Sequence, residues 1–357
     1  MARLPSAETP AAHFSYAGPM VSSRPATRAA SKLRPEISTR ARLHIVTGKG
    51  GTGKTTVAAA LAFALANAGR KVLLVEVEGR QAIAQLFDVA ALPYQEVRLT
   101  TAPSGGSLWG LAIDAEQAMI EYLDMFYGLK RSARGLKRMG AVDFVTTLAP
   151  GLRDVLLTGK VKEAVTRTDS DGHPAYDAVV LDGPPTGRIA KFLDATKEVA
   201  NLTKFGPINR QSDGVITLLH GPRTVVHLVT LLEEMPVQET LDAAAELTAL
   251  GFQLGVVVVN RARPALVTDG QLGTGNNGGV DVAVLKAGLR KARVPVAHAK
   301  AFALEMADYA QRQQIQAENS LRLDSLSAPR IELPDLNPPV ELGELNELAG
   351  HFLQDDR

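Results

Sequence analysis

Gly48-Lys49-Gly50-Gly51-Thr52-Gly53-Lys54-Thr55-Thr56 fits the pattern G-x-x-x-x-G-K-[ST]. The run before this stretch, Leu43 to Thr47, is short, apolar and β-branched, which favours a strand. The run after it, Val57 to Ala66, is rich in alanine, which favours a helix. A glycine-rich loop between a strand and a helix is the setting in which this pattern binds phosphate. The stretch therefore predicts a phosphate-binding loop, called the P-loop below.

The residue types of the P-loop indicate how it would hold a nucleotide. Glycine has no Cβ atom, so successive backbone N–H groups can surround an anion, and the following helix adds the partial positive charge of its N-terminus. We expect Lys54 to reach the β- and γ-phosphates and the Thr55 hydroxyl to ligate Mg²⁺. The predicted nucleotide contacts in this loop are Gly48, Gly50, Gly51, Thr52, Gly53, Lys54, Thr55 and Thr56.

The composition bounds the class of protein. The chain has 357 residues, of which 45% are hydrophobic and 22% charged, and its formal net charge is +1. This near-neutral balance gives no reason to expect nucleic acid as a partner. The longest apolar run, Val57 to Ala66, is much shorter than the roughly 20 residues that span a bilayer. We therefore expect a cytoplasmic protein without a direct membrane anchor.

Residues 1–42 differ from the rest of the chain. They carry seven Lys and Arg residues against two acidic residues and show no apolar periodicity. This pattern is typical of a disordered basic N-terminal tail, although an organellar transit peptide has a similar composition. Residues 43–353 read as a single domain.

Strand-like and helix-like segments alternate through this domain. Several of the strand candidates are unbroken apolar runs, which indicates strands buried on both faces. The alternation predicts an α/β fold, a mostly parallel central sheet with helices on both faces. The predicted strands are Leu43–Thr47, Lys71–Val77, Glu96–Thr101, Leu108–Ile113, Ala178–Asp182, Thr224–Thr230, Gly255–Asn260 and Arg330–Leu333.

Two segments interrupt the alternation. Residues 114–170 read as mostly helical, and such an insertion between core strands predicts a helical subdomain over the active site. A basic patch between Lys130 and Arg138 fits either an anionic partner or a solvated helix face. Residues 268–281 are rich in Gly and Asn, which predicts a flexible surface loop.

Polar residues at the strand ends are the other candidates. Asp182 ends a buried run and is expected to orient the water shell of Mg²⁺. Glu76 and Glu78 point the same way in strand geometry, and Glu78 is placed to orient the attacking water. Asn260, followed by Arg261, ends a later run, and its amide can pair with adenine. Each of these residues also has a plainer interpretation, as a polar group in a turn that ends a strand.

These motifs together resemble a known family. Lys49–Thr56 resembles the deviant Walker A motif of the SIMIBI class of P-loop ATPases, and Asp182–Leu193 resembles the signature of the ArsA/Get3 type. The segments Thr230–Thr240 and Val257–Arg261 are also similar to that family, whose order of elements fits residues 43–350. The likeness is greatest to actinobacterial ArsA-like anion-transporter ATPase subunits, which tend to occur in related pairs.

The resemblance implies roles for several residues. Lys49 would reach across a dimer interface to the partner's nucleotide, Asp182 would be the Walker B acid, and Glu78 would stand where the family has the aspartate that positions water. Asn260 would bind adenine, and the loop after Pro334 would cover it. ATP and Mg²⁺ are the implied cofactors. The implied partner is a second copy of the chain or a related ArsA-like subunit.

The departures from the family narrow these roles. Glu78 is one methylene longer than the family's aspartate, and a misplacement of about 1 Å can cost on the order of 100-fold in rate. Arg188 replaces the histidine of the signature. The chain has no cysteine, which excludes thiolate-bound arsenite, a C-x-x-C zinc clasp and an iron–sulfur cluster.

The leading interpretation is a Mg²⁺-dependent ATPase that acts as a dimeric switch and binds a client protein or small anion according to its nucleotide state. A nucleotide-binding scaffold with little hydrolysis is an alternative, because of Glu78. A MinD/ParA-like positioning ATPase is another alternative. Against it, residues 331–357 carry seven acids and one arginine, which anionic lipid would repel.

Overall fold

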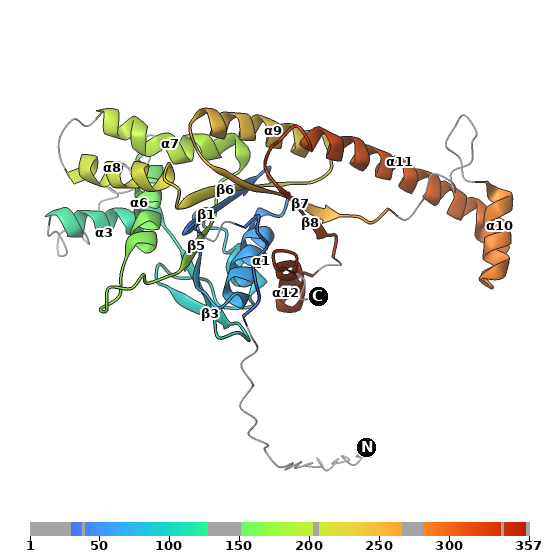
Figure 1. The fold of residues 1–357 in the computed structure, drawn as a ribbon, viewed down its shortest axis with the longest axis horizontal. Coiled ribbons are helices and arrows are strands. Elements are labelled where there is room, and N and C mark those ends of the chain that lie inside the picture. Colours follow the sequence, from blue (N-terminus) through green and yellow to red (C-terminus); the bar gives the residue numbers. More distant parts are fainter. Residues whose placement is uncertain are drawn as a thin grey trace, which may run out of the picture.

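An eight-stranded sheet forms the centre of the molecule (Figure 1). The computed structural model describes residues 30–37, 40–127, 151–202, 207–265, 281–336 and 339–354. The strand order is β3-β4-β2-β5-β1-β6-β7-β8. The strands are β1 (Leu43–Gly48), β2 (Lys71–Glu76), β3 (Val97–Thr101), β4 (Ser107–Ala112), β5 (Ala178–Asp182), β6 (Thr224–Thr230), β7 (Leu254–Ala262) and β8 (Arg330–Pro334).

The sheet is parallel except at one edge. Strand β3 pairs antiparallel with β4 through the short turn that joins them, while the remaining neighbours pair in parallel. Each strand predicted from the sequence corresponds to one of these strands, with ends that agree or differ by at most two residues. The predicted α/β class with a mostly parallel sheet is thus confirmed. In parallel sheets the carboxyl ends of the strands share one edge, where ligands bind.

Helices cover both faces of the sheet. Helices α1 and α12 pack on one face, whereas α6, α7 and α9 belong to the core of the other (Figure 1). Helix α1 lies between the sheet and α12, and its side chains from Val57 to Ala66 are all buried, as expected of a helix that is apolar all round. The helices are α1 (Lys54–Asn67), α2 (Ala82–Leu86), α3 (Ala115–Tyr127), α6 (Leu152–Thr166), α7 (Thr186–Leu202), α8 (Pro207–Leu219), α9 (Glu234–Ala249), α10 (Val282–Lys291), α11 (Ala299–Leu323) and α12 (Leu342–Gly350).

The packed part of the chain begins earlier than the sequence suggested. Leu33 forms an antiparallel bridge with Leu353, and the side chains of Leu33 and Ile37 are buried against the core that contains α1 and α12. Part of the segment predicted as a tail therefore packs on the domain before residue 43. Two apolar residues in a polar stretch give no periodicity, so the sequence did not reveal this contact. The rest of the predicted tail lies outside the described residues.

The helical insertion is described only at its two ends. Helices α3 and α6 pack on each other, and α6 packs on α7 and α8. The basic patch between Lys130 and Arg138 lies outside the described residues. The same holds for the glycine- and asparagine-rich loop except its last residue, Asp281, whose side chain caps the N-terminus of α10. Helices α10 and α11 form an arm that projects from the body in Figure 1. Among the described helices, none combines the length and hydropathy needed to cross a membrane.

Candidate functional site

The P-loop lies at the carboxyl edge of the sheet, between β1 and α1. Strand β1 pairs with β5 on one side and β6 on the other, so Asp182 and Val229 flank the start of the loop. Glycine is required at two positions by close contacts. A Cβ atom on Gly48 would lie 2.2 Å from the carbonyl oxygen of Val229, and one on Gly53 would lie 2.4 Å from Asn260 Nδ2. Gly53 also has a φ of 84°, which favours glycine.

The rest of the loop is arranged as the pattern predicts. Gly50 and Gly51 are exposed at the edge of the sheet, while Thr52 is buried and its hydroxyl donates to the carbonyl oxygen of Lys49. Lys54 opens α1 and is only 7% exposed. Thr56 follows in the first turn of α1 and is half-buried. The glycines, Lys54 and Thr55 thus lie together between the end of β1 and the first turn of α1, as the pattern predicts.

Thr55 and Asp182 form the acidic part of the site. The Thr55 hydroxyl donates to Asp182 Oδ2 at 2.6 Å, while Asp182 Oδ1 is buried without a hydrogen-bond partner. Burial raises the pKa of Asp182 to about 6, although the hydrogen bond from Thr55 and the charge of Lys54 oppose this rise. Burial also lowers the pKa of Lys54, against the charges of Asp182 and Glu78. A buried carboxylate oxygen without a donor is a position that a cation would occupy.

The two glutamates after β2 have different partners. Glu76 is buried, and its carboxylate accepts from the backbone N–H of Gln81 at 2.5 Å and of Ile83 at 3.3 Å. It therefore fixes the turn that follows β2. Glu78 is more exposed and forms an ion pair with Arg80 at 3.3 Å. Its charge acts on both Lys54 and Asp182, which places it near the phosphate end of the site.

Lys49 takes part in a network that reaches the helical layer. Its Nζ donates to Glu239 on α9, and the Thr186 hydroxyl, at the start of α7, donates to the other oxygen of the same carboxylate at 3.0 Å. The hydrogen bond from Lys49 lowers the pKa of Glu239. Glu239 had no role predicted from the sequence. Its place in the family-like segment Thr230–Thr240 was the one signal that could have singled it out.

A bulge near the end of β7 sends two neighbouring side chains in different directions. The pairing of β7 with β8 shifts between Val259 and Ala262, and Arg261 has a φ of 54°. The Asn260 amide is buried and donates to the carbonyl oxygen of Thr52 at 2.8 Å, so it supports the P-loop. Its contact with adenine stays a prediction, as do the contacts of Arg261 and Pro334 with the nucleotide.

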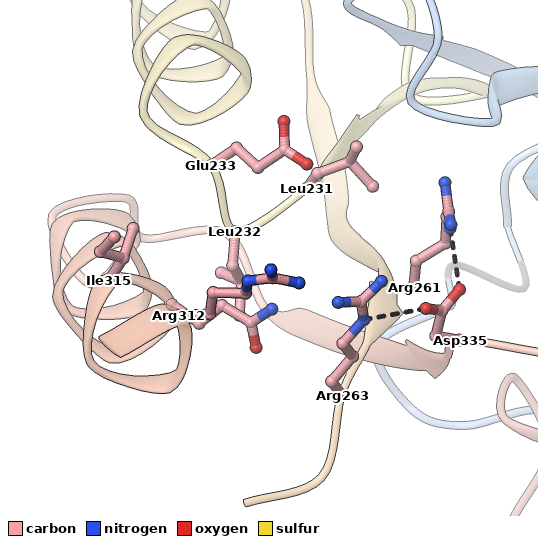
Figure 2. A pocket seen from close by; sticks show the side chains of 9 residues that line it. Leu231, Leu232, Glu233, Arg261, Arg263, Arg312, Ile315 and Asp335 are labelled. Atoms are coloured by element: carbon pink, nitrogen blue, oxygen red, sulfur yellow. Dashed lines mark hydrogen bonds and ion pairs between the residues drawn. The ribbon is translucent and has the colours of Figure 1, made fainter. Parts of the chain in front are cut away.

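Arg261 instead lines a cavity of about 310 Å³ between α11 and the segments at the ends of β6, β7 and β8, called the base-side cavity because it includes the segment predicted to cover the base. Figure 2 shows Arg261 and Arg263 both reaching Asp335, with Arg312 and Ile315 of α11 across from them. Arg261 Nε lies 2.8 Å from Asp335 Oδ1, and Arg263 Nε lies 3.0 Å from Oδ2. Asp335 follows Pro334, so the cavity includes the loop predicted to cover the base. Its volume is at the lower end of the usual range for small-molecule sites.

A smaller cavity of about 110 Å³ lies on the other side of the site, called the phosphate-side cavity below. It is lined by Glu78 and Arg80 after β2, by Arg153 on α6, and by Pro184 and Arg188 around the start of α7. The Pro184 carbonyl accepts from the Thr47 hydroxyl at 2.7 Å, which ties this wall to β1.

Comparison with known proteins agrees with this geometry. A family model described as "Anion-transporting ATPase" matches residues 41–222. The chain is 55% identical over 315 residues to the ATPase BagA of Mycobacterium tuberculosis, which covers 88% of this chain and 93% of that protein. It is 26% identical over 238 residues to the arsenical pump-driving ATPase of Escherichia coli, covering 61% and 39% of the two chains. A putative arsenical pump-driving ATPase of Chlorobaculum tepidum is 25% identical over 270 residues, covering 65% and 64%.

The matched region begins before β1 and contains the P-loop, Glu78, Asp182 and Arg188. The similarity to BagA extends over most of the remaining chain. A phosphate-binding loop, a buried carboxylate beside its threonine and an aligned family signature lead to one conclusion. The chain belongs to the anion-transporting ATPase family, the ArsA family, and is an ATPase of that family.

Proposed function

We propose that the chain is a Mg²⁺-dependent ATPase that acts as a dimeric switch, with a second copy or a related ArsA-like subunit as its partner. The observation that carries this proposal is the Thr55–Asp182 pair beside the P-loop, with Asp182 Oδ1 buried and unbonded. Such a pair has the composition of a magnesium site that the nucleotide completes. The nucleotide state would change the binding of a client protein or small anion.

The oxygens of Thr55 and Asp182 fit Mg²⁺, which needs few protein ligands, better than a metal ion that is held by protein side chains alone. Among the described residues there is no group of three or more His, Cys, Asp or Glu side chains around one position. Mg²⁺ commonly uses one or two protein oxygens and takes the others from phosphates and water. Thr55 would hold the ion directly and Asp182 through water, and the ion would neutralise charge on the phosphates. Lys54 would bind the β- and γ-phosphates from the first turn of α1.

The network around Lys49 supports the switch part of the proposal. For Lys49 to reach a partner's nucleotide, its amine must leave Glu239, which also holds Thr186 at the start of α7. Helix α7 packs on α6, α8 and α9. Movement of Lys49 would thus change contacts at the start of α7, the helix that packs on α6, α8 and α9. A ligand shifts such an equilibrium only through contacts that differ between the two states.

One observation favours the scaffold alternative. Glu78 is already paired with Arg80, and a carboxylate whose oxygen is held by an arginine is less free to orient an attacking water. In that case the chain would bind ATP and regulate a partner while it hydrolyses little. The ATPase switch and the scaffold are both expected to bind ATP, and they differ in the rate at which ATP is hydrolysed.

Lys54→Ala tests the enzyme. We expect Mg²⁺-dependent release of phosphate from ATP by the unmodified chain, its loss on addition of EDTA, and no turnover above background for the variant, because the variant lacks the cation that binds the β- and γ-phosphates. Lys286→Ala, an exposed lysine on α10, is the matched control. If the unmodified chain binds ATP but releases no phosphate, alone or with a related subunit, the scaffold function replaces the switch.

Lys49→Ala tests the dimer. A cation supplied across an interface can contribute on the order of 10³-fold in rate, so kcat should fall much more than ATP affinity does. The dependence of the specific activity on protein concentration should also be lost. A fall in affinity alone, with kcat unchanged, would show that Lys49 acts within its own chain.

A further inference from the structure

The phosphate-side cavity gathers positive charge from three separate parts of the chain. Arg80 comes from the segment after β2, Arg153 from the first turn of α6, and Arg188 from the first turn of α7. Strands β2 and β5 are neighbours in the sheet, and their register pairs Glu76 with Asp182. The segments that follow the two strands therefore meet at this edge. The fold brings these residues together, because Arg80, Arg153 and Arg188 lie far apart in the sequence.

These positive charges lie where the backbone already favours anions. Helices α6 and α7 each present their N-terminal turn to the cavity, and a helix N-terminus carries a partial positive charge. Asp154 is the one acidic residue in the first turn of α6, and the first turn of α7 has none. Arginine at such positions is unfavourable unless an anion lies nearby.

The carboxylates near the cavity do not fully satisfy the arginines. Arg80 pairs with Glu78 at 3.3 Å, and Arg188 pairs with Asp154 at 3.4 Å. Both distances exceed the roughly 2.7–2.9 Å of a strong charge-assisted hydrogen bond. Three guanidinium groups against two carboxylates also leave one positive charge in excess. A guanidinium offers five N–H donors in a planar fork, which matches the oxygens of phosphate.

The size and place of the cavity restrict what would bind there. At about 110 Å³ it is well below the roughly 300 Å³ where sites for drug-sized ligands begin. It borders the phosphate end of the nucleotide site, because Pro184 on its wall lies two residues after Asp182 and accepts a hydrogen bond from Thr47, which directly precedes the P-loop. A small tetrahedral oxyanion fits both the volume and the charge.

We propose that the phosphate-side cavity is a binding site for inorganic phosphate, which holds the phosphate released from ATP before it leaves the protein. This inference rests on the proposed hydrolysis for its source of phosphate. Water attacks the γ-phosphorus, and the bond to the bridging oxygen of ADP breaks in the nucleotide site. No bond forms or breaks in the cavity itself. Bound phosphate would draw Arg188 away from Asp154 and so change the contact between α7 and α6 after hydrolysis.

The first experiment measures binding without turnover. Equilibrium dialysis with radiolabelled inorganic phosphate is performed on the full chain saturated with ADP, so that the P-loop is occupied. We expect one phosphate per chain in the unmodified protein, and at least about tenfold weaker binding after Arg153→Gln with Arg188→Gln, since each charged hydrogen bond contributes that much or more. Arg290→Gln with Lys291→Gln on α10 removes the same charge from exposed positions and should bind normally.

A second variant separates the cavity from the P-loop. In Lys54→Ala without nucleotide, phosphate binding that depends on Arg153 and Arg188 should persist. Equal phosphate binding with and without the two arginines, in either protein, would overturn the site. Should the double variant fail to fold, judged by circular dichroism, Arg153→Gln alone is used, because Arg153 is exposed and its removal leaves the Arg188–Asp154 pair in place.

The second experiment identifies the source of the anion. In a single turnover, cleavage is followed by rapid quench and release by a fluorescent phosphate sensor. We expect release to lag behind cleavage in the unmodified chain and to coincide with it in the Arg153/Arg188 variant. Identical lags in the two proteins would overturn the role in product release and make the cavity a site for free oxyanion from solution. Absence of cleavage with retained phosphate binding would overturn the proposed function and leave the oxyanion site.

Discussion

The base-side and phosphate-side cavities contain the same residue type in different states. In the base-side cavity, Arg261 and Arg263 share the carboxylate of Asp335 at 2.8 and 3.0 Å. In the phosphate-side cavity, Arg80 and Arg188 meet their carboxylates only at 3.3 and 3.4 Å. Paired arginines form a wall of fixed shape, whereas loosely paired ones keep donors for a ligand. The two cavities therefore differ in how closely their arginines are paired with carboxylates.

The surroundings of the cavities agree with this difference. Leu231, Leu232 and Ile315 contribute apolar surface to the base-side cavity (Figure 2), as expected of a pocket for a flat base. The phosphate-side cavity is mostly polar and lies at two helix N-termini. The P-loop lies between them, with Asn260 on one side and Asp182 on the other. Substitutions can therefore change the residues near one cavity and leave the other cavity intact.

Asp182→Asn should have the largest effect, a fall in kcat. It should leave the binding of nucleotide at the base-side cavity unchanged. Loss of the carboxylate removes the group expected to orient the magnesium shell, which we expect to cost several kcal/mol in the transition state, or about 10³-fold in kcat. Binding of a fluorescent ADP analogue without Mg²⁺ should change little, because the base-side cavity is intact. Stopped-flow hydrolysis and equilibrium titration measure the two quantities. A variant that hydrolyses ATP normally would remove Asp182 from the site.

The same variant should be more stable than the unmodified chain, and the gain should depend on pH. Burial raises the pKa of Asp182 from 3.8 to about 6, so the folded state holds this proton more tightly than the unfolded state does. Stability from that proton is complete below about pH 4 and is lost as the pH rises through 6. Urea denaturation should show a gain of roughly 1–3 kcal/mol at pH 7.5 that shrinks toward pH 4.5. A gain that is equal at both pH values would contradict the assigned pKa.

Glu78→Gln should have the next largest effect. If Glu78 orients the attacking water, kcat should fall by about 100-fold, at the lower end for general base catalysis, while ATP affinity stays the same. Glu347→Gln, an exposed carboxylate on α12, is the matched control. An unchanged kcat would mean that Glu78 serves only to hold Arg80 beside the phosphate-side cavity. That result would leave water positioning to another residue.

The strands of the mostly parallel sheet and the place of the P-loop between a strand and a helix could be predicted from the sequence, because both depend on local patterns. Unbroken runs such as Val256 to Val259 indicate buried strands, and the motif fixes Lys54 and Thr55. Asp182 could also be predicted, since it ends a buried strand. The packing of Leu33 and Ile37 could not, because their partners lie at the other end of the chain.

The partners of the polar residues were also beyond sequence reasoning. Glu239 lies 190 residues from Lys49, and Asn260 lies 208 residues from Thr52. The contact of Asn260 with adenine stays a prediction, and the hydrogen bond from its amide to the P-loop backbone was not foreseen. An amide at a strand end suits either role, and only the bulge in β7 decides where the side chain turns. Each cavity is also formed by segments that lie far apart in the sequence. The difference in arginine pairing between the two cavities therefore appears only in the folded chain.

Asp335→Ala should have the smallest effect of the three and should act on the base side. Without the carboxylate, Arg261 and Arg263 lose their shared partner and repel each other, so the wall of the base-side cavity loses its shape. We expect the dissociation constant of a fluorescent ADP analogue to rise about tenfold, equivalent to roughly 1.4 kcal/mol, with kcat at saturating ATP unchanged. Stability should fall by no more than about 1 kcal/mol, because the pairs are partly exposed.

Asp324→Ala is the control for Asp335→Ala, since it removes the partner of Arg330 away from either cavity. Unchanged nucleotide binding by Asp335→Ala would mean that the base lies elsewhere along the carboxyl edge of the sheet. The two cavities would then differ only in how closely their arginines are paired. If phosphate binding to the ADP-saturated chain also weakened, the cavities would be coupled through the P-loop, because Asn260 links β7 to Thr52. Independent responses, with nucleotide affinity following Asp335 and phosphate affinity following Arg153 and Arg188, would establish the two cavities as separate parts of one ATPase site.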